Sequence, residues 1–149
     1  MDIKGFKVNF LGDSITQGWC SSRDSLSWAW NLCFALNAEM LNQGIGGSFA
    51  EPTAFPHGVD YDPDTVIVAY GTNDWSGANN EKLEEHALGF LQALRKNYPN
   101  ARLVMLAPVW RNKWDRERPL VTFPEIPEIF RRIAAQVGNV DVIDCFSFI

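Results

Sequence analysis

The segment TVIVAYGTND, residues 65–74, decides the fold of this 149-residue chain. Its first six residues are apolar, aromatic or β-branched, they follow the turn sequence Asp62-Pro63-Asp64, and they end at Gly71. A short run of this kind, bounded by turn residues, is typical of a strand buried on both faces of a parallel sheet. We therefore predict a central strand over residues 65–70, with a polar loop at its carboxyl end.

Strand and helix patterns alternate on both sides of this segment. Buried-strand patterns occur at residues 7–11, 39–41, 102–107 and 140–143. Apolar residues at helical spacing predict helices over residues 28–36, capped by Ser27, over 83–96 and over 129–137. Alternating strands and helices imply right-handed βαβ units. We predict one domain over residues 1–149, a three-layer α/β/α fold with a parallel, flavodoxin-like sheet of about five strands.

Charge and cysteine usage narrow the environment and the partners. The formal net charge is −5 and the pI is near 4.9, so we expect no nucleic-acid partner. Cys20, Cys33 and Cys145 form no C-x-x-C pair, which predicts free thiols in a reducing compartment. The sequence begins without a secretory leader and contains no apolar run of 18 residues. We expect a cytoplasmic protein with no membrane partner.

Three polar motifs each follow a predicted strand. They are GDS at residues 12–14, NQGIGG at residues 42–47, and GTND at residues 71–74. Three glycines within four positions of the second motif predict a loop from residue 42 onward. Because the carboxyl ends of parallel strands meet at one edge of a sheet, we expect the three motifs to converge there.

In this order and spacing the motifs resemble those of the SGNH (GDSL-type) hydrolases, an esterase and lipase family. The resemblance implies a serine hydrolase acting on carboxylic esters, of the acyl-ester or acetylated-carbohydrate type, with no cofactor and no metal. It assigns Ser14 as the nucleophile and the backbone N–H of Gly47, the side-chain amide of Asn73 and the N–H of Ser14 as oxyanion donors. Asp13 and Asp74 would shape the loops by bonding backbone amides.

Each of these residues also has a purely structural interpretation. Ser14 could cap a turn or helix, Asn73 could form an Asx turn, and Gly44 and Gly46 could serve only to permit a positive φ. The two aspartates could be taken for a glycosidase-like carboxylate pair. Nucleotide binding is disfavoured, because the glycine loop lacks the third glycine of G-x-G-x-x-G and the Lys-Ser/Thr of a P-loop.

The resemblance also implies an Asp-x-x-His motif after the last strand, and residues 140–149 (VDVIDCFSFI) are followed by none. The histidines of the chain are His57, in a Pro-His-Gly loop, and His86, for which we expect a solvated helix position. We therefore expect a truncated chain of little activity that could self-associate through an uncovered sheet face. The alternative is a non-catalytic acyl- or glycan-binding module that has lost its base.

Tryptophans and a long connection accompany the motifs. Trp19, Trp75 and Trp110 fall on or near strand-end loops, where they would either line a substrate wall or pack under a loop. Residues 108–124, rich in Trp and Arg, lack clear periodicity and follow a predicted strand. Loops of this length are usually functional or disordered.

Overall fold

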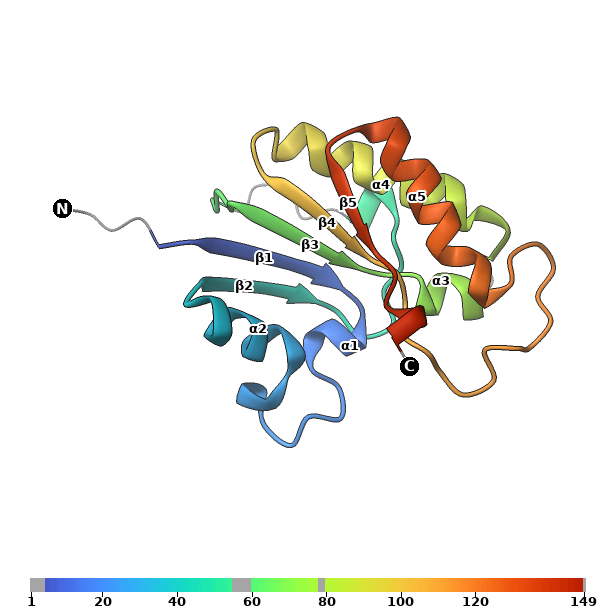
Figure 1. The fold of residues 1–149 in the computed structure, drawn as a ribbon, viewed down its shortest axis with the longest axis horizontal. Coiled ribbons are helices and arrows are strands. Elements are labelled where there is room, and N and C mark those ends of the chain that lie inside the picture. Colours follow the sequence, from blue (N-terminus) through green and yellow to red (C-terminus); the bar gives the residue numbers. More distant parts are fainter. Residues whose placement is uncertain (1–4, 55–59, 78–79, 149) are drawn as a thin grey trace.

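The computed structural model describes residues 5–54, 60–77 and 80–148. Its strands form one five-stranded sheet in the order β2-β1-β3-β4-β5, and every neighbouring pair is parallel (Figure 1). The sheet confirms the predicted α/β fold. The strands are β1 (Lys7–Gly12), β2 (Glu39–Gly44), β3 (Thr65–Ala69), β4 (Arg102–Leu106) and β5 (Val140–Ile143).

Helices cover both faces of this sheet, as expected for three layers. The long helices α4 and α5 lie on one face and α2 lies on the other (Figure 1). None of the helices within the described residues is both long and apolar enough to cross a bilayer. The helices are α1 (Ser14–Gln17), α2 (Trp28–Leu36), α3 (Thr72–Ser76), α4 (Leu83–Asn97) and α5 (Ile126–Val137). Single 3-10 turns are η1 (Asp24–Leu26), η2 (Pro52–Ala54), η3 (Asn80–Lys82), η4 (Phe123–Glu125) and η5 (Phe146–Phe148).

The larger core lies between the sheet and the two long helices. Fully buried aromatic and aliphatic side chains from both helices pack on the apolar residues of β3 and β4. Helix α5 begins three residues earlier than predicted, because Pro127 fits its first turn, where no backbone N–H is required. The principal helix residues of this core are Phe90, Leu91, Leu94, Phe130 and Ile133.

The smaller core lies under α2, and its helix face agrees only in part with the predicted one. Ala29 and Cys33 are buried in one cluster with residues of β1, β3 and β4, and Trp28 and Leu32 of the predicted apolar stripe pack against it, whereas Ala35 and Leu36 are exposed. Leu36 is the last residue of the helix. The predicted cap is confirmed, because the Ser27 Oγ accepts the Trp30 N–H at 3.3 Å.

Strand β2 is longer than the sequence pattern indicates. Residues 42–44, predicted as loop, pair in register with residues 10–12 of β1, so that prediction is wrong. Parallel pairing supplies the backbone hydrogen bonds that a glycine-rich segment does not secure by itself. A Cβ at Gly44 would overlap the backbone nitrogen of Gln17. Glycine at this position therefore permits close packing of α1 on β2.

We expect Gly44→Ala to destabilise the protein by about 1–3 kcal/mol, because an added Cβ must displace the backbone of α1. Gly5→Ala is the matched control, since a Cβ there meets nothing within 4 Å. Urea unfolding of the two variants measures the difference. Equal midpoints would show that α1 does not depend on close approach to β2.

Candidate active site

The Gly-Asp-Ser motif forms the turn between β1 and α1. Ser14 is the first residue of α1 and is half-buried. Asp13 is the N-cap: its Oδ1 accepts the Ile15 N–H at 2.9 Å, and its side chain is 2% exposed. Gly18, with φ 104°, ends the helix after one turn. The strand thus delivers the Ser14 side chain to the carboxyl edge of the sheet, as predicted.

Asn42, at the end of β2, joins the second motif to this turn. Its Nδ2 donates to the Thr16 carbonyl at 2.8 Å, and its Oδ1 accepts the Gly44 N–H at 2.9 Å. One amide side chain therefore satisfies a carbonyl of α1 and an N–H of its own strand. The sequence shows Asn42 at the start of the second motif, but nothing in it indicates that the side chain bonds Thr16.

The glycine loop that follows lies beside Ser14. The Gly46 N–H donates to Gln17 Oε1 at 2.9 Å, and a Cβ built on Gly46 would lie 3.8 Å from the Ser14 Cβ. Gly47 has φ +79°, a conformation that favours glycine, whereas Gly44 and Gly46 are not in the positive-φ region. The interpretation that Gly44 and Gly46 serve to permit a positive φ is therefore wrong. In this loop Gly47 is the glycine that adopts a positive φ.

Asn73 brings the third motif to the glycine loop. It lies in α3, and its Nδ2 donates to the Ser48 carbonyl at 3.1 Å. The Ser48 hydroxyl in turn donates to the Ile45 carbonyl at 2.7 Å. The Asn73 side chain thus bonds the residue that follows Gly47. An Asx turn is a local structure and would not require this long-range contact. The amide nitrogen carries a second hydrogen for another acceptor.

Asp74 holds the glycine loop and the start of α3 together. Its Oδ1 accepts the Ala50 N–H at 2.9 Å and its Oδ2 accepts the Gly71 N–H at 3.0 Å. Its side chain is 2% exposed, and this burial raises the pKa of Asp74 above its ordinary value, an effect that the backbone hydrogen bonds only partly oppose. Asp13 and Asp74 both bond backbone amides, which is the contact that the resemblance implied.

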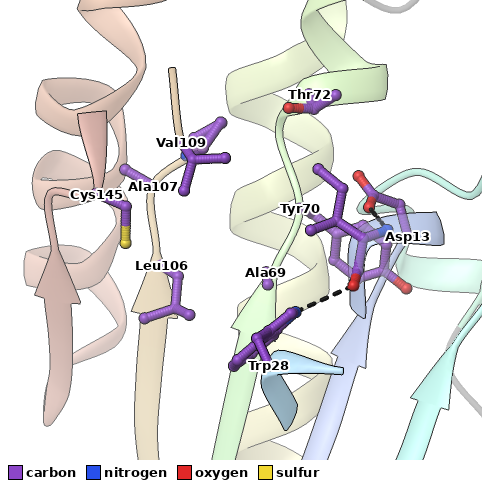
Figure 2. A pocket seen from close by; sticks show the side chains of 11 residues that line it. Asp13, Trp28, Ala69, Tyr70, Thr72, Leu106, Ala107, Val109 and Cys145 are labelled. Atoms are coloured by element: carbon purple, nitrogen blue, oxygen red, sulfur yellow. Dashed lines mark hydrogen bonds between the residues drawn. The ribbon is translucent and has the colours of Figure 1, made fainter. Parts of the chain in front are cut away.

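A largely apolar cavity of about 420 Å³ adjoins the Ser14 turn. Figure 2 shows it between the ends of β3, β4 and the segment after β5, with Trp28 of α2 at one side. The Trp28 Nε1 donates to the Ile15 carbonyl at 3.1 Å, which fixes the indole against α1. The other lining residues are Asp13, Ala69, Tyr70, Thr72, Leu106, Ala107, Pro108, Val109 and Cys145.

The three tryptophans singled out in the sequence differ in their surroundings. Trp75 is 1% exposed and packs edge-to-face on Phe123 at a centroid distance of 5.0 Å, so it belongs to the core. Trp19 and Trp110 are exposed, and neither lines the cavity. The substrate-wall interpretation is therefore wrong for Trp75.

The histidines do not supply a base to this cavity within the described residues. His57 lies outside the described residues. His86 is half-buried on α4, with its Nδ1 3.8 Å from Glu51 Oε1, so the expectation of a solvated position is wrong. The described residues also hold no group of three His, Cys, Asp or Glu side chains arranged for a metal ion.

The arrangement of three motif-bearing loops at one edge of a parallel sheet is that of the SGNH class of hydrolases. Residues 10–149 match the GDSL-like lipase/acylhydrolase family, and the chain belongs to that family of ester hydrolases. No curated protein sequence matches the chain at a significant level.

Solved structures share the fold. The esterase AlinE4, an SGNH-hydrolase family member, superposes with a TM-score of 0.76 at 18% identity over 96% of this chain and 77% of its own. The salicylyl-acyltransferase SsfX3 of a tetracycline biosynthetic pathway gives 0.76 at 19% identity, over 97% of this chain and 44% of its own. A two-domain esterase active on acetylated mannans gives 0.71 at 23% identity, over 93% and 37%. The chain therefore spans less than half the length of two of these proteins.

We expect Asp74→Asn to lower the free energy of unfolding by about 1–3 kcal/mol, because an amide cannot accept both buried backbone N–H groups. Asp141→Asn is the control, since that carboxylate forms an exposed pair with Arg102 and pairs of this kind contribute little. Thermal unfolding at pH 7 compares the two. Two equal melting temperatures would mean that Asp74 does not hold the loops together.

Proposed function

We propose that the protein is a serine hydrolase of carboxylic esters, with Ser14 as the nucleophile. The Ser14 hydroxyl attacks the ester carbonyl, and the backbone N–H groups of Gly47 and Ser14, with the Asn73 amide, bind the oxyanion that forms. The observation that carries this proposal is the 3.1 Å hydrogen bond from Asn73 to Ser48, which fixes the amide beside Gly47. Preorganised donors of this kind are usually the largest single contribution to acyl-transfer catalysis.

The proposed substrate is a small-molecule or carbohydrate ester, of the acyl-ester or acetylated-carbohydrate type. Similar folds carry an esterase active on acetylated mannans and an acyltransferase, both of which act at ester or acyl carbonyls. Neither nucleic acid nor a membrane is a proposed partner, and no cofactor enters the reaction. The free thiols of Cys20, Cys33 and Cys145 favour a cytoplasmic location for this single domain of residues 1–149.

The proton of Ser14 requires an acceptor. A neutral serine hydroxyl is a weak nucleophile at pH 7, and in the subtilisin triad loss of the histidine lowers kcat by about 10⁶. The printed sequence has no Asp-x-x-His motif, and among the described residues no histidine lines the cavity beside Ser14. The second candidate function is a non-catalytic module that binds acyl or glycan groups.

We expect this chain to hydrolyse p-nitrophenyl acetate barely above the background rate, and imidazole to raise the rate by about 10² by acting as the missing base. The apolar cavity is lined by Asp13 and Ile15, the residues on either side of Ser14, and offers imidazole a space close to this turn. Ser14→Ala should abolish the increase beyond the reaction of imidazole in buffer, whereas Ser25→Ala, at an exposed position of η1, should retain it. An imidazole-dependent rate that survives Ser14→Ala would remove Ser14 as nucleophile, and no increase at all would favour the binding module.

We also propose that the chain self-associates through the face of β4 and β5 opposite α5. Leu106 is partly exposed there, and Ile143, its partner in β5, is 40% exposed. Helix α2, the long helix on this face, packs mainly over β1 and β2 (Figure 1). Among the residues that the structure describes, no helix covers this part of the face, and exposed apolar surface favours association in water.

Light scattering should therefore show an average mass that rises with protein concentration, and Ile143→Lys should restore the monomer by placing a charge on this face. Leu120→Lys is the control, because Leu120 is 67% exposed but lies on the 108–122 connection. A wild-type protein that stays monomeric, or a control that dissociates the protein equally well, would contradict the proposal.

A further inference from the structure

The connection between β4 and η4 carries a local positive charge on an acidic protein. Arg111, Lys113, Arg116 and Arg118 lie within eight positions that hold two acidic residues, whereas the whole chain has a net charge of −5. Basic side chains concentrated on one strand-end loop create a local field that attracts anions. The connection therefore differs in charge from the protein that carries it.

Two of these arginines are fixed to α3 in the same way. The Arg111 and Arg118 guanidinium carbons lie 5.6 and 4.9 Å from the centre of the buried Trp75 ring. Arg111 Nη1 donates to the Thr72 carbonyl at 3.2 Å, and Arg118 Nη2 donates to the Ser76 carbonyl at 2.8 Å. The two residues thus make equivalent contacts at opposite ends of one short helix, and only Arg111 lies at the Asn73 end.

Arg111 also lies next to the cavity beside Ser14. Its hydrogen-bond partner Thr72 lines that cavity, as do Val109, two residues earlier in the chain, and Asp13 (Figure 2). Burial raises the pKa of Asp13, and the charge of Arg111 acts in the opposite direction, which agrees with this proximity. A half-buried guanidinium is therefore held close to both the nucleophile turn and Asn73.

Arg111 is not neutralised by an acidic partner. Arg102, Arg131 and Arg132 each pair with a carboxylate, whereas within the described residues Arg111, like Arg118, bonds a backbone carbonyl and no carboxylate. A guanidinium group has five N–H donors in a planar fork that matches a carboxylate. The bond to Thr72 holds the group in place and leaves donors for a ligand.

We propose that Arg111 is a specificity-determining residue that binds a carboxylate carried by the ester substrate. This inference rests on the proposed function, because the carboxylate is bound beside Asn73 while the ester carbonyl faces Ser14. The carboxylate accepts two parallel N–H bonds from the guanidinium, which orients the substrate as well as attracting it. Since the cation is fixed on Trp75 before the substrate arrives, little side-chain entropy is lost on binding.

The test compares two ligands that differ in one group, monophenyl succinate and phenyl butyrate, on Ser14→Ala protein, which cannot form an acyl-enzyme through Ser14. Calorimetric titration should show the succinate monoester binding about tenfold to hundredfold more tightly than the butyrate. Arg111→Gln should remove this preference, and Arg111→Lys should keep part of it, since the charge remains without the fork. The preference should also weaken as salt is added.

Arg118→Gln is the matched control, because it removes the same ring contact and an equivalent bond to α3. It should leave the preference for the succinate unchanged. Equal binding of the two esters, or an equal loss in the Arg111 and Arg118 variants, would overturn the inference. Ser14 chemistry does not enter the measurement, so failure of the hydrolase proposal would leave this binding result as it stands.

Discussion

The buried carboxylate of Asp74 is the group on which the candidate site depends. It accepts backbone N–H bonds from Ala50 and Gly71, and so connects the loop after β2 to the turn after β3. Removing a carboxylate from water costs several kcal/mol, and the raised pKa of Asp74 reports that cost. Charge-assisted hydrogen bonds offset it only while both loops keep their positions. The carboxylate therefore penalises any movement of one loop relative to the other.

Other polar side chains also connect separate segments at this edge of the sheet, where the strands end and their backbone groups no longer pair with a neighbouring strand. The amide of Asn42 bonds α1, the side chain of Gln17 bonds the glycine loop, and Asn73 bonds that loop from α3. Each of these bonds joins segments that are far apart in the sequence. For the proposed hydrolase, these bonds would fix the donors before a substrate arrives, which is the condition under which backbone and amide N–H groups stabilise an oxyanion effectively.

What the sequence can predict depends on whether a feature is determined by local residues or by contacts between distant segments. Residues 65–70 and 102–107 predict strands correctly, because apolar runs between turn residues are buried in any arrangement of the sheet. Gly44 was assigned to a loop, since its place in β2 depends on pairing with β1 and on the approach of α1. The sequence does not single out Arg111, because the position of its side chain depends on Trp75 and Thr72, about 40 residues earlier. Motifs identify residue types, whereas long-range packing determines their partners.

The charges around Ser14 decide which acids can take part in the chemistry. A carboxylate close to the oxyanion of the proposed reaction would destabilise it, because like charges repel. Asp13 and Asp74 are therefore unfavourable neighbours for the charge that the proposed reaction creates, and burial, which raises the pKa of both acids, already opposes their own ionisation. The hydrogen bonds of the two carboxylates direct their own negative charge toward backbone N–H groups. The positive charge of Arg111 partly offsets that of Asp13. In the proposed hydrolase the two aspartates thus act as positioning groups for the loops, and the N–H donors stabilise the oxyanion.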